Sequence, residues 1–199
     1  MIEMNEDINK LSDEKRIELI AEHFSQIITL LGEDTARQGL LKTPLRAAKA
    51  LYYLTSGYRS DASQTLSEAL FDHEGSKVVT VRDIEFYSMC EHHILPFFGK
   101  ISIAYIPGDK IVGLSKLARV VNVCARKLQV QERLTSEITK VVADTLGARG
   151  VLVLCEAQHL CMKMRGVEKQ DASTTTIDYT GDFATDPDLR RETLDALRH

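Results

Sequence analysis

The spacing of apolar residues changes near residue 77, and this change restricts the chain to folds that combine helices with a sheet. Between residues 11 and 31 apolar side chains recur at three- and four-residue spacing, which is the period of an amphipathic helix. Within residues 79–86 and 101–105 they alternate with other residues at period two, which is typical of strands. A chain that carries both patterns in separate segments predicts an α+β protein.

Further elements follow from the same patterns. Thr43 and Pro44 are suited to the start of a second helix, which is expected to end near Gly57. The polar segment 58–76 predicts a connecting loop that could contain a helical turn. Ser115 is a candidate N-cap for a third helix. The complete predicted order is helices at 11–31 and 43–57, strands around 79–86 and 101–105, helices at 115–128 and 130–146, strands at 151–157 and 173–180, and a helix at 186–197.

Length and charge limit the organisation and the partners. With 199 residues the chain is long enough for one domain and short for two, so we expect a helical arm and loop over 1–76 and the main domain over 77–199. The net charge of −4 argues against a nucleic-acid binder. Without a signal pattern at the start or an apolar run of membrane-spanning length, a cytoplasmic, non-membrane protein is expected, in which cysteines are thiols or metal ligands.

Thiol and imidazole groups gather in two short stretches. Cys90 and His93 have the spacing of a zinc-ligand pair, and His159 and Cys161 would project to one face of an extended segment. Zinc held by Cys90, His93 and Cys161 would leave a fourth position open. His92 and His159 would then stand beside the metal, where imidazoles are suited to proton transfer near pH 7.

Two other cysteines, and the pair itself, leave alternatives open. Cys90 and His93 could occur together by chance, because buried cysteine often serves as a small hydrophobe. Cys124 lies on an apolar helical stripe, which favours core packing. Cys155 is also interpreted as core, although it could close the metal site as a fourth ligand.

Basic residues indicate an anion site. Lys116 and Arg119 lie three apart in the first turn of a predicted helix, beside Ser115, where a phosphate would fit. Arg165 and Arg46 could join them through the fold. The alternative is a solvated helix face, which is the commoner outcome for such a pair.

Several motifs together resemble a known family. They are "TPLRAAK" at 43–49, "SMCEHHILPFFGK" at 88–100, "AYIPG" at 104–108, "VGLSKLARVV" at 112–121, "QVQERLT" at 129–135 and "EAQHLCMKMRGVEKQDASTTT" at 156–176. In their order and content they resemble the GTP cyclohydrolase I family.

The resemblance implies an activity and a metal. The expected reaction opens the imidazole ring of GTP, releases C8 as formate and recloses the product to 7,8-dihydroneopterin triphosphate, the first step of tetrahydrofolate or other pterin biosynthesis. By this resemblance Cys90, His93 and Cys161 hold zinc, which activates water.

Individual roles are implied in the same way. His159 resembles the acid that protonates the ring nitrogen, and His92 with Ser115 resembles the pair used in later proton transfers. Glu132, with Gln131 before it, resembles the guanine anchor, since a carboxylate can accept hydrogen bonds from N1–H and the 2-amino group. The residues that resemble a triphosphate clamp are Lys116, Arg119, Arg165 and Arg46.

The family's architecture is expected as well. It is the tunnelling fold, here an antiparallel four-stranded sheet with helices on one face, assembled as a homodecamer of two pentamers with active sites between subunits. The chain leaves the family pattern at Ile177, Asp178 and Tyr179. Two alternatives remain: a scaffold with structural zinc closed by Cys155 or His159, and a tunnelling-fold enzyme that acts on a pterin and needs no triphosphate clamp.

Overall fold

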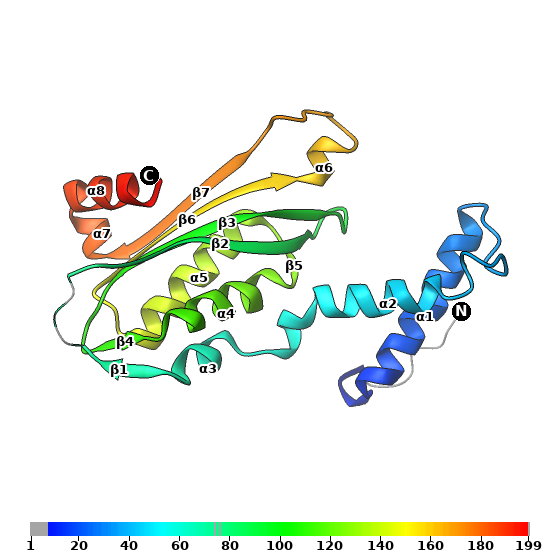
Figure 1. The fold of residues 1–199 in the computed structure, drawn as a ribbon, viewed down its shortest axis with the longest axis horizontal. Helices are drawn as coiled ribbons and strands as arrows, with labels where there is room; N and C mark the ends of the chain where they lie inside the picture. Colours follow the sequence, from blue (N-terminus) through cyan, green and yellow to red (C-terminus); the bar gives the residue numbers. More distant parts are fainter. Residues whose placement is uncertain (1–7, 74, 76, 199) are drawn as a thin grey trace. The chain divides into compact units, whose positions relative to one another are not determined.

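The computed structural model describes residues 8–73, 75 and 77–198 (Figure 1). Its contacts divide the chain into one compact unit that ends at Leu54 and another that begins at Thr55. The domain boundary expected at residues 76 and 77 stays a prediction. None of the helices in the described ranges is both long and apolar enough to cross a membrane.

The first unit is a pair of helices, as the apolar spacing predicts. They are α1 (Asp13–Leu30) and α2 (Thr43–Leu54), after a short turn of 3-10 helix, η1 (Ile8–Lys10). Ser12 caps α1, because its side chain accepts a hydrogen bond from the Lys15 backbone amide. The two helices contact each other, and the Tyr52 hydroxyl lies 2.5 Å from the Asp13 carboxylate.

The second unit is built on one curved sheet in the strand order β5-β2-β3-β6-β7. The four long strands are antiparallel neighbours, as the resemblance predicts, whereas β5 runs parallel to the end of β2. This two-residue strand is an addition to the four expected. The strands are β2 (Val79–Cys90), β3 (Pro96–Ile106), β5 (Leu128–Gln129), β6 (Gly150–His159) and β7 (Thr174–Gly181).

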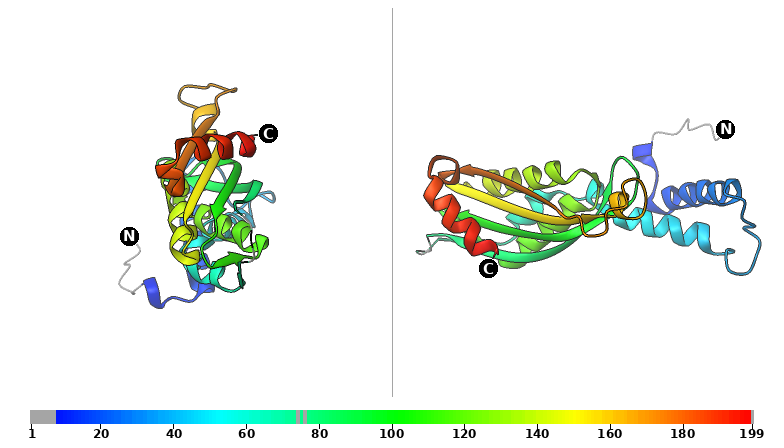
Figure 2. Two further views of the ribbon diagram at one scale, coloured as in Figure 1. Left: turned by 90° about the vertical axis from the view of Figure 1, so that its left-hand side faces the viewer. Right: turned by 90° about the horizontal axis from the view of Figure 1, so that it is seen from above.

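Helices cover both faces of this sheet to different extents (Figures 1 and 2). α4 (Leu114–Ala125) and α5 (Gln131–Leu146) pack on one face over the main core. The expectation of helices on one face alone is incomplete. Apolar residues of β3 and β6 also point to the other face, and a second core forms where α7 (Asp182–Thr185) and α8 (Pro187–Arg198) cover them. Its buried members are Ala104, Ile106, Leu152, Leu154, Phe183 and Leu197.

The segment predicted as a connecting loop contains three elements. They are η2 (Ser56–Arg59), α3 (Ala62–Ser67) and β1 (Leu70–Asp72), and Leu66 is fully buried. β1 pairs with β4 (Lys110–Val112), so the structure of this segment depends on a partner strand about forty residues away. The helical turn that the prediction allowed for is present as α3. β1 was missed, because local patterns do not contain information about its partner strand.

The predicted limits of the third helix were also wrong at both ends. Gly113, not Ser115, occupies the N-cap position of α4, because the Gly113 amide is bonded to the Ala69 carbonyl where β1 begins and β4 ends. At the other end the helix stops at Ala125, and Leu128 belongs to β5, where it pairs with Met89 of β2. Ser115 therefore lies inside the first turn of α4.

Candidate active site

Two segments distant in sequence meet at one end of the sheet (Figure 1). β2 ends at Cys90, and the connection to β3 turns back on itself, with the Cys90 amide bonded to the Leu95 carbonyl and the Ile94 amide to the Cys90 carbonyl. On the other side of β3, strand β6 ends at His159 and runs into the helical turn α6 (Leu160–Lys163). This topology brings the two stretches of thiol and imidazole groups together.

Cys90, His93 and Cys161 form a compact donor group. Their sulfur and nitrogen ligand atoms all lie within 4.8 Å of one another, and the Cys90 sulfur is 4.0 Å from His93 Nδ1. The same sulfur is 3.7 Å from Nδ1 of His92. Cys161 reaches the group from α6 and not from the extended segment that the sequence pattern predicts, because β6 stops at His159.

The donor chemistry fits a divalent cation of the zinc type. Two thiols and one imidazole are the ligands that such ions prefer, and three protein ligands leave one position open. Burial, followed by the neighbouring Cys90, raises the pKa of Cys161. A cation between the two sulfurs would oppose both effects, because it favours the thiolate forms.

The other two cysteines are buried away from this group. Burial raises the pKa of Cys124 and of Cys155 to about 12, so neither thiol supplies a thiolate near neutral pH. Cys155 is fully buried in the main core. In the described part of the chain the donor group consists of three residues and excludes Cys155 and His159, which disfavours a closed four-ligand site.

His159 is held on its face and at one edge. Its ring stacks on Phe97, with centroids 4.7 Å apart and an interplanar angle of 3°, across the β3–β6 register. Its Nε2 atom lies 2.7 Å from Oε1 of Gln131, the first residue of α5. Burial lowers the pKa of His159, and the charge of Glu132 opposes this shift, so the imidazole is neutral at pH 7.

Gln131 fixes the tautomer of this histidine. Its amino group donates to the Cys155 and Thr174 backbone carbonyls, at 3.1 and 3.0 Å, and the reversed amide would place oxygen against both. Oε1 therefore faces His159, and because an amide oxygen only accepts, His159 Nε2 carries the hydrogen. The Nδ1 atom of His159 is then the one that can take up and release a proton. Sequence reasoning predicted Gln131 as a substrate contact and did not find this role.

Glu91 lies beside the donor group with a cationic partner. One carboxylate oxygen pairs with the Arg133 guanidinium and the other is 4.0 Å from Nε2 of His92. This position is suited to orienting His92, which is mostly exposed. Arg133 is a neighbour that the sequence patterns did not single out.

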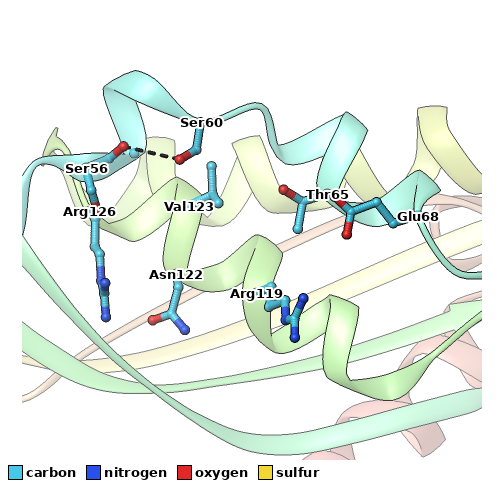
Figure 3. A pocket seen from close by; sticks show the side chains of 9 residues that line it. Ser56, Ser60, Thr65, Glu68, Arg119, Asn122, Val123 and Arg126 are labelled. Carbon is cyan, nitrogen blue, oxygen red and sulfur yellow. Dashed lines mark hydrogen bonds between the residues drawn. The ribbon is translucent and has the colours of Figure 1, made fainter.

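The predicted phosphate residues lie in several places. Lys116 and Arg119 are on the first two turns of α4, next to Glu68 at the end of α3. Arg119 also lines a pocket of about 300 Å³ between η2, α3 and α4 (Figure 3). The charge of Arg165 acts to lower the pKa of Cys161, so Arg165 lies near the donor group. Arg46 belongs to the first unit, and its part in a clamp stays a prediction.

An open three-donor group with the His92 imidazole beside it, and with His159 two residues before the donor Cys161, is typical of an enzyme that uses a metal. Comparison with known proteins agrees. The model of the family described as GTP cyclohydrolase I matches residues 20–198. The chain therefore belongs to the GTP cyclohydrolase I family, and its fold is the tunnelling fold.

Individual relatives support the same assignment over nearly the whole chain. "GTP cyclohydrolase 1" of Porphyromonas gingivalis is 53% identical over 88% of this chain and 91% of its own. The protein of that name in Bacteroides thetaiotaomicron is 51% identical over 92% and 93%. "GTP cyclohydrolase 1 2" of Pseudomonas aeruginosa is 49% identical over 90% of this chain and 99% of its own. The chain is thus an enzyme with GTP cyclohydrolase I activity, as the sequence predicts.

Proposed function

We propose that the enzyme opens the imidazole ring of GTP, releases C8 as formate and forms 7,8-dihydroneopterin triphosphate, with zinc held by Cys90, His93 and Cys161. The observation that carries this proposal is the three-donor group with His92 beside it. His159, anchored by Gln131, precedes the ligand Cys161 by two residues. Zinc at this position would supply a water whose pKa is lowered to about 7.

His159 and His92 carry out the proton transfers of the reaction. His159 takes up and releases a proton at Nδ1, because its Nε2–H is committed to Gln131. Because its lowered pKa leaves the imidazole neutral at pH 7, His159 must first take up a proton at Nδ1. The protonated form is then a stronger acid, which suits proton donation to the ring nitrogen of guanine. His92, exposed beside Glu91, serves the later transfers with Ser115.

Glu132 binds the guanine base. It follows Gln131 in the first turn of α5, close enough to His159 for its charge to affect that pKa. A carboxylate there accepts hydrogen bonds from guanine N1–H and the 2-amino group, an arrangement that adenine does not offer. The side chain of Gln131 is occupied by its own contacts, so any direct help from Gln131 comes through its backbone.

In this proposal Lys116, Arg119, Arg165 and Arg46 bind the triphosphate, and they give an acidic chain the positive charge that an anionic substrate needs. The assembly is a homodecamer of two pentamers. Exposed apolar side chains on the sheet, Tyr87 on β2 and Ile177 and Tyr179 on β7, support pairing between subunits. Sedimentation velocity on the full chain tests this, and a monomer at micromolar concentration would contradict it.

The reaction is tested by incubating zinc-loaded protein with GTP and following ultraviolet absorbance together with formate. A dihydropterin band that grows in step with one equivalent of formate is expected. Zinc bound at one per chain with neither product would instead favour the structural-zinc alternative. Formate without the pterin band would mean that the ring opens and is not reclosed.

A further inference from the structure

Glu68 pairs with Lys116 and lies near Arg119, the two cations of α4 that are proposed to bind phosphate. Its carboxylate forms a salt bridge with Lys116. Lys116 first, and Arg119 among the smaller causes, lower the pKa of Glu68, so the group is ionised at neutral pH. Figure 3 shows Glu68 and Thr65 at the same end of the 300 Å³ pocket as Arg119, with Ser56, Ser60 and Arg126 at the other end.

The two partners of this ion pair differ in their environment. The Lys116 side chain is only 12% exposed, so its charge needs an anionic partner, whereas Glu68 is 54% exposed. Glu68 also follows the last turn of α3, where a negative charge gains nothing from the helix. The carboxylate can therefore move into water at small cost, but the ammonium group cannot lose its partner without another anion.

We propose that Glu68 is an internal counter-ion of the phosphate clamp, which occupies Lys116 and Arg119 until a polyphosphate displaces it. This inference rests on the clamp of the proposed function and adds a residue that sets its affinity. A single phosphate carries too little negative charge to displace the Glu68 carboxylate efficiently. A triphosphate chain can span both cations, and its negative charge is several times that of the carboxylate it replaces. Glu68 thereby favours nucleoside triphosphates over monophosphates.

The experiment measures binding of inorganic tripolyphosphate and of guanosine, separately, by calorimetry to the zinc-loaded full-length enzyme. Glu68→Gln keeps the shape and removes the charge. We expect it to bind tripolyphosphate about three- to tenfold more tightly at low salt, with the difference shrinking as salt increases, because exposed charges are screened. Affinity for guanosine should not change, and the KM for GTP should fall in the same ratio.

Asp72→Asn is the matched control. Asp72 on β1 forms an ion pair with Lys110 on β4, and its side chain is exposed like that of Glu68. Lys110 is not one of the residues proposed to bind phosphate. Its tripolyphosphate affinity should equal that of the unmodified enzyme. Equal melting temperatures of both variants check that the fold is intact.

Unchanged or weaker binding of tripolyphosphate by Glu68→Gln would overturn the counter-ion role, and so would an equal gain for guanosine. Lys116→Ala separates this failure from failure of the clamp itself. If Lys116→Ala leaves tripolyphosphate affinity unchanged, Lys116 is not in the clamp. If it weakens binding while Glu68→Gln has no effect, the clamp stands and only the counter-ion inference fails.

Discussion

At the scale of single residues, Gln131 shows how a buried amide can determine the chemistry of a neighbour. It is fully enclosed, its amino group serves the Cys155 and Thr174 carbonyls, and its oxygen accepts from His159. Removing it would leave two buried carbonyls without that donor and the imidazole without its anchor. We therefore expect both the stability of the fold and the proposed proton transfer at His159 to depend on this one side chain.

Gln131→Met tests this dependence with a side chain of similar length. We expect the free energy of unfolding to fall by about 1–3 kcal/mol, because buried polar groups lose their partner, and kcat to fall more than KM changes. Denaturant unfolding and steady-state kinetics measure the two effects. Gln158→Met, at an exposed position of β6, is the control. Unchanged kcat in the Gln131 variant would show that the anchor is not needed.

Cys161 and the buried cysteines should differ in their effect on metal content. Cys161→Ala removes one of three donors, so we expect zinc and GTP turnover both to be lost. Cys124→Ala and Cys155→Ala alter core side chains and should retain one zinc per chain. Elemental analysis of the purified variants measures this. Loss of zinc from the Cys155 variant would instead indicate a closed four-ligand site.

Glu132 should affect the substrate and leave the metal in place. Glu132→Ala removes the proposed partner of two guanine donors, which typically costs about 2–5 kcal/mol in binding. We expect a large rise in the KM for GTP with zinc content unchanged. Asp144→Asn, an exposed acid on the same helix, should behave as the unmodified enzyme. A Glu132 variant with normal KM and kcat would remove this residue from the guanine site.

At the scale of elements, local patterns identified segments with their own periodicity and missed those defined by a partner. The spacing in α5 and the run in β6 are visible in the chain itself. By contrast, β1 has three residues and exists through its pairing with β4, and β5 has two and pairs with β2. Neither segment is long enough for a period to be recognised.

Gly57 is the position where η2 docks on α4. Its amide donates to the Arg126 carbonyl, and a Cβ atom placed there would come within 2.1 Å of the Val123 carbonyl oxygen. Gly57→Ala should therefore lower the free energy of unfolding by about 1–3 kcal/mol, since backbone atoms cannot easily give way. Gly39→Ala, which would meet only the end of the Arg37 side chain, is the control. Equal thermal unfolding of the two variants would contradict the close approach.

At the scale of the whole molecule, the candidate site was predictable in part. Cys90 and His93 are close in sequence, so their pairing follows from spacing, and the family motifs identify Cys161. The contacts of Phe97 with His159 and of Glu68 with Lys116 join residues 62 and 48 positions apart. Such pairs depend on strand register and helix docking, which no local pattern specifies.

The two compact units also predict how the protein responds to truncation. Each donor of the proposed metal group lies beyond Thr55, as does the main core. A fragment that starts at Thr55 is therefore expected to fold and to retain zinc at one per chain, which circular dichroism and elemental analysis measure. Arg46→Ala in the full chain is the companion variant, and it should raise the KM for GTP without loss of zinc. A zinc-free, unfolded fragment would show that the first unit is required for folding.

The position of the donor group at the rim of the sheet has a consequence for how the enzyme matures. Its ligands come from residues 90, 93 and 161, which meet only after β2, β3 and β6 have paired. Cys90 belongs to the main core and Cys161 packs against it, but most of that core is formed by other residues of the sheet and helices. Under the proposed zinc site, the metal therefore binds after these strands have paired. We expect a cell short of zinc to accumulate folded, inactive enzyme, whose activity returns when zinc is supplied, without new protein synthesis.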